Sequence, residues 1–291
     1  MCGVSAKAPP LSVVVTTRGG VAEVQPVLEA LAPQVERTGA EVIVVGGPED
    51  RDRAPDWVVR LPDDDGDMLR IRLRGIQSTT GKVIAIGEDH AIPRPDWCEA
   101  VIRAHAENPD RLAVAGSLVN GTDRTFMGRT NFDWFASPFQ PPLDPFCDDH
   151  PPPASVISIK RDAIYVLGGP GDFEGALLPR LSWDGQIAPD GRIVTDHYQD
   201  HGLRGSLGGA FHGGRSTYGH RRSKMSRRDR RQALGDIGPR LVLGPVREAW
   251  RYGGVRSPAE LAVIALLGLT TALGCAVGIL RGPGRSGSLV P

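Results

Sequence analysis

Two carboxylates and an imidazole follow one another at Glu88-Asp89-His90, directly after the apolar run KVIAIG at residues 82–87. That run predicts a buried strand, and polar groups at its end cost stability unless a partner compensates them. A divalent cation that bridges to a diphosphate would be such a partner, because hard oxygen ligands suit Mg²⁺ or Mn²⁺. A solvated turn explains the same three residues, so the motif by itself leaves both interpretations open.

The elements that must position this motif alternate between strand and helix patterns. Apolar, β-branched runs predict strands at Leu11–Thr17, Glu41–Val45, Trp57–Leu61, Lys82–Gly87 and Arg111–Val119. Helices are predicted between them at Val21–Leu31, at Asp67–Thr79 and from Asp96 to about Asn108. The order predicts an α/β fold whose mostly parallel sheet carries helices on both faces.

Ligands of such sheets bind beyond the carboxyl ends of the strands. Three groups of residues follow predicted strands and are therefore the first candidates for a site: Thr16-Thr17-Arg18, Gly46-Gly47 and Glu88-Asp89-His90. The composition then changes at residues 122–153, which are rich in proline, aspartate and aromatic residues and show no clear period. We predict a long functional loop or lid there, because linkers seldom carry so many aromatic residues.

An uncharged stretch of twenty residues runs from Leu261 to Leu280. As a helix it would be about 30 Å long, which matches the hydrocarbon core of a bilayer. We therefore predict a C-terminal transmembrane helix at residues 259–281, with a buried core helix as the alternative. Seven Lys or Arg residues lie at 220–231, ahead of the stretch. The positive-inside rule then predicts a single-pass protein of the cell membrane, with residues 1–256 in the cytoplasm.

These patterns divide the chain into five parts. Residues 1–10 and 282–291 are predicted to be disordered, residues 11–222 to form a catalytic domain, and residues 223–258 to form a basic, membrane-proximal segment before the transmembrane helix. A formal net charge of zero argues against a general nucleic-acid binder. The four cysteines lie far apart and give no spacing of a zinc site or a disulfide framework.

The segment GKVIAIGEDHAIPRPDWCEAVIRAH resembles the metal-binding segment of family-2 glycosyltransferases. Gly81, the pair Glu88-Asp89 and Trp97 stand at the places of that family's glycine, acidic motif and helix entry. LSVVVTTRGG at residues 11–20 is similar to the family's opening strand and loop, which hold the nucleotide base. The resemblance covers roughly residues 11–120 and 154–222 and implies a GT-A (Rossmann-like) fold.

The nucleotide contacts of the family are present only in part. Arg72 lies in RIRLRG, where the family usually has an "Arg-Asn-x-Gly" motif, and the asparagine is missing here. The family also places an Asp pair after its second strand, whereas this chain continues with Gly46-Gly47-Pro48 and reaches its first acids at Glu49 and Asp50. Either Asp50 reaches back to the nucleotide or backbone groups make that contact, and the acids at 63–65 are a further source.

DFEGALLPRLSWDGQIAPDGRIVTDH at residues 172–197 resembles the segment of the family that supplies the general base and a second metal ligand. The resemblance implies that Glu174, or else Asp172, deprotonates the acceptor hydroxyl. A carboxylate that simply favours the start of a helix is the alternative for Glu174. His197 would be a metal ligand beside Asp89, and His201 is a nearby competitor for that role.

FHGGRSTYGHRR at residues 211–222 resembles a late "Gly-Arg…Arg" segment of a subgroup of the family, and Arg215 would there clamp the diphosphate. For Arg227–Arg231 we favour attraction to anionic lipid.

The resemblance as a whole implies an inverting glycosyltransferase that moves a sugar from a nucleotide-diphosphate donor to a hydroxyl of a glycan, lipid or envelope precursor. Mg²⁺ or Mn²⁺ would be bound by Asp89 and His197, and Trp134, Phe135 and Phe139 would cover the sugar or the acceptor. The implied nucleotide-sugar contacts are Thr16, Arg18, Gly46, Asp50, Arg72, Gly81, Glu88 and Arg215. A non-catalytic protein that keeps the fold as a scaffold stays open, as does a nucleotidyltransferase, although the loop after the first strand is short for one.

Overall fold

The computed structural model describes residues 8–49, 53–63, 66–143, 152–166, 177–199 and 201–290. The chain divides into two compact units. The first unit comprises residues 1–64, 70–117 and 142–196, and the second comprises residues 65–69, 118–141 and 197–291. The predicted general bases Glu174 and Asp172 and the predicted nucleotide contact Asp50 lie outside the described residues.

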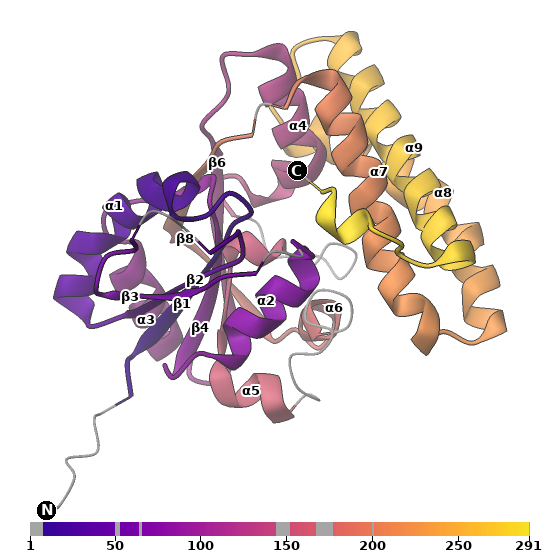
Figure 1. Ribbon diagram of the computed structural model, residues 1–291. Helices are drawn as coiled ribbons and strands as arrows, with labels where there is room; N and C mark the ends of the chain where they lie inside the picture. The colour runs from indigo at the N-terminus through magenta and orange to yellow at the C-terminus, as the bar shows by residue number, and fades with distance from the viewer. Residues whose placement is uncertain are drawn as a thin grey trace, which may run out of the picture. The chain divides into compact units, whose positions relative to one another are not determined.

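An eight-stranded sheet with the strand order β3-β2-β1-β4-β7-β6-β8-β5 is the centre of the fold (Figure 1). Strands β1 to β4 pair in parallel, whereas β7 runs antiparallel to both β4 and β6, which makes the sheet mixed. The strands are β1 Leu11–Thr16, β2 Glu41–Val45, β3 Val58–Leu61, β4 Val83–Glu88, β5 Ala91–Pro93, β6 Ala113–Asn120, β7 Ile157–Lys160 and β8 Ile187–His197. The predicted strands of the first 120 residues are all present, within two residues of their predicted bounds.

Helices cover both faces of the sheet, as predicted (Figure 1). Alternate residues of β1 show this directly. Val13 and Val15 belong to a core cluster with residues of two helices on one face, whereas a Cβ on Gly75, on the other face, would lie 2.3 Å from Val14. Burial on both faces explains why β1 is apolar throughout. The helices with residues in this unit are α1 Val21–Thr38, α2 Met68–Gln77, α3 Trp97–Glu107, α5 Arg161–Val166 and α6 Leu178–Trp183, with the 3₁₀ turn η2 Ala154–Val156.

The segment predicted to be a lid is in part a regular helix. Helix α4 spans Phe126–Ala136, and the Thr125 side chain caps its start by accepting the N–H of Gly128 at 2.9 Å. Four consecutive residues, 130 to 133, are buried. Because α4 is buried around its circumference, its sequence lacks the apolar period of an amphipathic helix, and the prediction of a loop was wrong for these residues.

The second unit is otherwise built from helices that follow β8. Its long helices are α7 Gly202–Arg221, α8 Arg227–Tyr252 and α9 Pro258–Arg281, with the 3₁₀ turns η1 Ser137–Phe139, η5 Arg222–Lys224 and η6 Ser286–Ser288. Helix α9 matches the predicted apolar helix, and Ser257 and Glu260 form a capping box at its start. Among the described residues, α9 is the one helix that is long and apolar enough to cross a membrane.

Candidate functional site

The ends of β1 and β4 fix the backbone of the Glu88-Asp89-His90 motif. The two strands pair so that Thr16 lies opposite Glu88. The buried Thr16 hydroxyl donates to the Gly87 carbonyl at 3.2 Å, and the Asp89 N–H donates to the Thr16 carbonyl at 3.2 Å. The motif therefore starts from a rigid strand end at the carboxyl edge of the sheet, where ligands of α/β sheets bind.

The loops after β1 and β2 are in backbone contact beside this motif. Gly46 and Gly47 have φ angles of 97° and 69°, which favour glycine. A Cβ on Gly46 would lie 2.2 Å from the Thr17 carbonyl oxygen, and one on Gly47 would lie 2.5 Å from the Gly20 nitrogen. The predicted nucleotide contacts Gly46 and Arg18 thus belong to one continuous backbone edge, at which two glycines permit the close approach.

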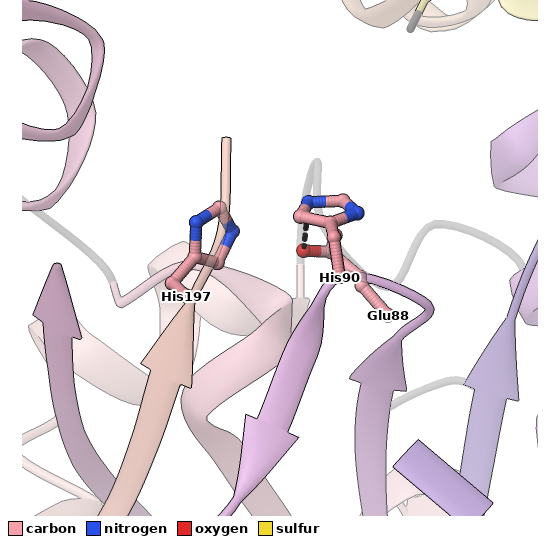
Figure 2. Close-up of side chains that lie close together, drawn as sticks. All are labelled: Glu88, His90 and His197. Carbon is pink, nitrogen blue, oxygen red and sulfur yellow. Dashed lines mark ion pairs between the residues drawn. The ribbon is translucent and has the colours of Figure 1, made fainter. Parts of the chain in front are cut away.

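Glu88, His90 and His197 offer ligand atoms that all lie within 4.8 Å of one another (Figure 2). Glu88 ends β4, His90 precedes β5, and His197 is the last residue of β8, which neighbours β5 in the sheet. The two neighbouring strands are joined by the Arg94 N–H, which donates to the Val194 carbonyl at 3.1 Å. Sheet pairing therefore brings the two imidazoles and the carboxylate together from segments more than 100 residues apart in sequence.

Charged neighbours surround the carboxylate and the first imidazole of this triad. Arg72 on α2 forms an ion pair with Glu88, and His90 Nε2 lies 3.6 Å from the other Glu88 oxygen. His90 Nδ1 lies 2.7 Å from Asp89 Oδ1. Burial lowers the pKa of His90, but the hydrogen bond with Asp89 and the charge of Glu88 outweigh burial and leave its pKa above the ordinary value. The immediate surroundings of His90 thus hold two carboxylates and one guanidinium.

His197 is buried and is held by its own surroundings in the second unit. Its carbonyl accepts the N–H of Gly121 at 2.8 Å, and the Phe135 ring of α4 lies 5.1 Å from its imidazole. Phe135, which the sequence placed in a lid over the substrate, therefore packs against a residue of the triad.

A carboxylate oxygen and two imidazole nitrogens are a donor set that a divalent transition metal such as Mn²⁺ fits well. The set consists of His197, one of the two predicted metal ligands, with Glu88 and His90. Asp89, the other ligand that the resemblance predicts, lies within hydrogen-bond distance of His90, and its role as a ligand stays a prediction. Residues 89 and 90 form a turn after β4, so the convergence of Glu88 and His90 depends on this turn, and no strand period in the sequence reports it.

The other predicted site residues lie elsewhere. The Gly81 N–H donates to the Ser12 hydroxyl at 2.8 Å, near the start of β1 and thus at the end of the sheet remote from Glu88. Gly81 serves there as a point of close approach, since a Cβ would lie 2.5 Å from that hydroxyl. Arg215 belongs to α7 of the second unit, where its Nε donates to the Gly282 carbonyl at 3.3 Å.

Comparison with known proteins supports this fold. No family model matches the chain. A glucosyl-dolichyl phosphate glucuronosyltransferase of Haloferax volcanii is 31% identical over 96 residues, and the match spans 31% of this chain and 31% of that protein. The chain therefore matches about a third of the length of its curated relative.

Two solved structures are similar to the chain. A mannosyltransferase from Pyrobaculum calidifontis, in complex with GDP-mannose and Mn²⁺, has a TM-score of 0.53 at 16% identity, over 95% of this chain and 88% of that one. A glucosyl-3-phosphoglycerate synthase from Mycobacterium tuberculosis, in complex with Mn²⁺, UDP-glucose and phosphoglyceric acid, has a TM-score of 0.45 at 15% identity, over 69% and 75% of the two chains. The first of these likenesses confirms the predicted GT-A-like fold.

Proposed function

We propose that this protein is a metal-dependent glycosyltransferase that moves a sugar from a nucleoside-diphosphate donor to a hydroxyl group. The observation that supports this most is the gathering of Glu88, His90 and His197 at the carboxyl edge of a GT-A-like sheet. The relatives agree with the proposal, because the curated one is named as a sugar transferase and the mannosyltransferase of the same fold holds GDP-mannose and Mn²⁺.

In this proposal the triad holds Mn²⁺ or Mg²⁺, which when bound would stabilise the negative charge of a departing nucleoside diphosphate. Arg72 holds the Glu88 carboxylate in place through their ion pair. The glycine-permitted edge at residues 17–20 and 46–47 offers backbone groups to the nucleotide. The attacking hydroxyl would lose its proton to Glu174, as the resemblance predicts, and inversion at the anomeric carbon would follow from a single in-line displacement.

We extend the proposal to the acceptor and the place of action. The curated relative is named for a dolichyl phosphate, which favours a lipid-linked acceptor here as well. Helix α9 supplies the apolar surface for membrane association. The sequence predicts that α9 crosses the membrane with residues 1–256 in the cytoplasm.

The proposal is tested by a thermal-shift experiment on the whole chain in detergent, with UDP or GDP, each with and without Mn²⁺. A ligand that binds only the folded protein at a hundred times its Kd adds about 2.7 kcal/mol, so we expect one nucleotide to raise the melting temperature by several degrees, and only with the metal. Transfer of the matching labelled sugar to a lipid phosphate then tests the acceptor.

His197→Ala is expected to abolish the metal-dependent shift, while His220→Ala, which removes an imidazole from the end of α7, keeps it. A wild-type chain that binds no nucleoside diphosphate under any of these conditions would favour the scaffold alternative. Release of pyrophosphate from a nucleoside triphosphate, without sugar transfer, would favour the nucleotidyltransferase.

A further inference from the structure

Helix α9 is joined to two neighbouring helices by direct backbone contact. A Cβ on Gly274 would lie 2.1 Å from the Phe211 carbonyl of α7, and one on Gly278 would lie 2.5 Å from the Arg215 carbonyl. A Cβ on Gly268 would lie 2.2 Å from the Leu241 carbonyl of α8. No side chain fits at these three positions, so α7 and α8 pack against two adjacent faces of α9, each in direct backbone contact with it.

The order of these contacts gives the directions of the helices. The residue numbers of the contacts between α7 and α9 increase together, from Phe211 with Gly274 to Arg215 with Gly278, so α7 runs parallel to α9. The residue numbers in α8 decrease as those in α9 increase: Leu241 contacts Gly268, and Ile237 lies in one cluster with Ile279. Helix α8 therefore runs antiparallel to α9. The arginine-rich start of α8 at residues 227–231 therefore lies beside the end of α9. Residues 227–231 precede the start of α9 in sequence, but in the structure they lie beside its C-terminal end.

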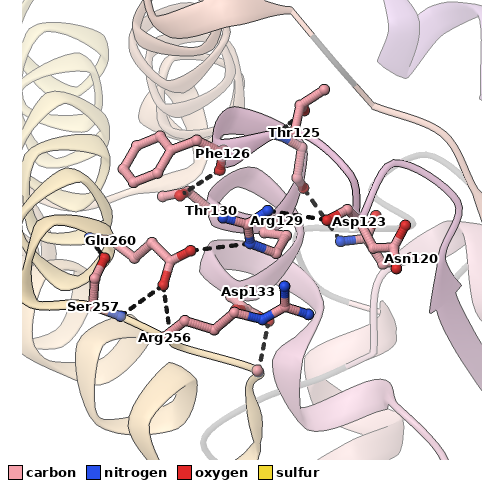
Figure 3. Close-up of polar contacts among 12 residues, drawn as sticks. Asn120, Asp123, Thr125, Phe126, Arg129, Thr130, Asp133, Arg256, Ser257 and Glu260 are labelled. Atoms are coloured by element: carbon pink, nitrogen blue, oxygen red, sulfur yellow. Dashed lines mark hydrogen bonds and ion pairs between the residues drawn. The ribbon is translucent and has the colours of Figure 1, made fainter.

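The start of α9 is fixed to α4 by buried polar contacts (Figure 3). The buried Glu260 carboxylate forms an ion pair with Arg129 of α4, in which Arg129 Nε donates to Glu260 Oε1 at 3.1 Å. The same carboxylate accepts the N–H groups of Arg256 at 2.5 Å and Ser257 at 3.0 Å. This end of α9 consequently lies within the polar protein.

The other end of α9 is also held by polar groups. The Gly282 carbonyl accepts Nε of Arg215, and His212 Nδ1 lies 3.1 Å from the Ser286 hydroxyl. Gly287 is packed on Asp67, since a Cβ there would lie 2.0 Å from the carboxylate. Asp67 directly precedes α2, so residues 282–290 lie on the same side of any membrane as the chain that enters α2.

A bilayer-spanning α9 conflicts with these contacts in two ways. A spanning α9 would place its two ends on opposite sides of the membrane, although both ends contact polar groups of the second unit. It would also draw α7 and α8 into the hydrocarbon core, where each arginine near the middle costs about 2.5–3.5 kcal/mol on insertion scales. Helix α8 alone carries Arg240 and Arg247 in its second half.

The face of α9 opposite its glycines is apolar and exposed. Leu266, Leu269, Leu273 and Leu280 follow one another at helical spacing, with exposed fractions of 41%, 58%, 58% and 62%. No charged residue lies between Leu261 and Leu280. A water-soluble contact between two helices is normally flanked by charges, which this stripe lacks, whereas the acyl layer of a membrane requires none.

We propose that α7, α8 and α9 form a monotopic anchor, in which the leucine stripe of α9 lies within one leaflet and the arginines at the start of α8 contact anionic headgroups. In this arrangement α9 runs along the membrane surface, and residues 282–290 stay on the same side of the membrane as Asp67. The proposed contact combines burial of apolar area with attraction between positive side chains and anionic lipid at the same membrane surface. It does not depend on the sugar-transfer proposal.

Cysteine labelling tests the topology in the full chain. Gln77→Cys on α2 and Leu289→Cys in the tail are made separately in a chain with Cys2 and Cys147 replaced by alanine, while the buried Cys98 and Cys275 remain. Cells are treated with a membrane-impermeant maleimide before and after permeabilisation. We expect both introduced cysteines to become reactive under the same condition. Labelling of one in intact cells and of the other only after permeabilisation would show a membrane-spanning α9 and overturn the proposal.

Vesicle flotation tests the lipid contact. The wild-type chain is expected to float with vesicles of phosphatidylcholine and phosphatidylglycerol, and the four Leu→Ser changes in the stripe should abolish flotation. Val59→Ser with Tyr165→Ser, which alters exposed apolar residues of the first unit, should not. Arg228→Gln and Arg231→Gln should each lower the partition coefficient about fivefold at low salt.

Two results would contradict the lipid contact. One is a wild-type chain that stays with the soluble fraction. The other is a leucine variant with unchanged flotation whose mass in solution falls from dimer to monomer, which would assign the stripe to a second copy of the chain. Far-UV circular dichroism of each variant confirms that the helices are intact.

Discussion

At the scale of single residues, the turn after β4 decides which of three adjacent polar side chains can share one ion. Glu88 and His90 lie two residues apart and converge with His197, whereas Asp89 holds the His90 ring. We propose that Asp89 supports His90, because the second nitrogen of a metal-bound imidazole commonly bonds to a carboxylate.

The first prediction follows from this assignment. Asp89→Asn should lower the Mn²⁺ affinity about 10- to 100-fold, as the loss of an outer carboxylate does. Glu88→Gln should lower it further, because the change removes an ionised ligand. Isothermal titration with Mn²⁺ measures both. A larger loss in Asp89→Asn than in Glu88→Gln would show that Asp89 itself binds the metal. Because two of the three donors are imidazoles, Mn²⁺ should bind more tightly than Mg²⁺.

Asp133 on α4 is a second residue whose surroundings make a measurable prediction. It is buried beside Glu260, and its carboxylate accepts the Gly254 N–H at 3.3 Å. Burial raises its pKa to about 6, with the charge of Glu260 acting in the same direction and Arg129 and Arg256 opposing it. The folded protein therefore binds the Asp133 proton more tightly than the unfolded chain does. The contribution of this proton to the free energy of unfolding is full below about pH 4 and is lost as the pH rises through about 6.

Asp133→Asn keeps the shape without the charge. The stability of the variant relative to wild type should therefore rise between about pH 4 and pH 6 and level off above it, by about 2–3 kcal/mol in total. Thermal melts of both proteins at a series of pH values measure the difference. A difference that stays constant across this range would mean that the wild-type carboxylate is not buried in this way.

At the scale of elements, glycines decide how the helices of the second unit pack. Those of α9 face carbonyl oxygens of α7 and α8, whereas Gly213 of α7 has no atom within 4 Å of the place its Cβ would take. Gly274→Ala should consequently destabilise the protein by about 1–3 kcal/mol through overpacking. Gly213→Ala should be neutral or stabilise it by about 0.5–1 kcal/mol, because alanine favours the helix.

Thermal unfolding in detergent compares the two variants under identical conditions. Equal melting temperatures for Gly274→Ala and Gly213→Ala would contradict the close packing of α9 on α7.

Two kinds of element could be predicted from the sequence: helices whose buried residues recur with the helical period, and short strands in which every residue is buried. The apolar strands β1, β2 and β4 and the Asp96 start of α3 are of this kind. Helix α4 escaped prediction because it is buried around its circumference. Helix α7 escaped because seven of its twenty residues are glycine and few are apolar, which gives no helical period.

The site could be predicted only as far as local sequence determines it. The sequence predicts His197 and the acidic motif as metal-binding candidates, but which carboxylate lies beside His197 depends on the turn after β4. The position of the basic run depends on the antiparallel course of α8, which no sequence pattern reports. The strand β7 likewise enters the sheet antiparallel between β4 and β6, a pairing set by tertiary contacts rather than by its own residues.

At the scale of the whole molecule, the second unit depends on its last helix. Ile237 of α8 shares a core cluster with Ala272, Cys275 and Ile279 of α9, and Tyr218 of α7 packs on the same cluster. A chain that ends at Ser257 would expose this cluster and the backbone grooves that receive the glycines. We expect such a truncated chain to aggregate and to lose helix content beyond that of α9 itself.

Circular dichroism and size-exclusion chromatography measure these two effects. A soluble, monodisperse chain of residues 1–257 with α7 and α8 intact would show that the unit does not need α9.

The contact of Gly287 with Asp67 joins residues that are 220 positions apart in sequence (287 − 67). Strands β1 to β4 are complete once residue 88 has left the ribosome, whereas this contact waits for residue 287. Synthesis therefore imposes an order, with the parallel strands pairing early and the helical unit closing only after residue 287 has been made. During that interval α7 and α8 carry unfilled grooves, and the nascent chain is then most exposed to chaperones, proteases and premature contact with lipid.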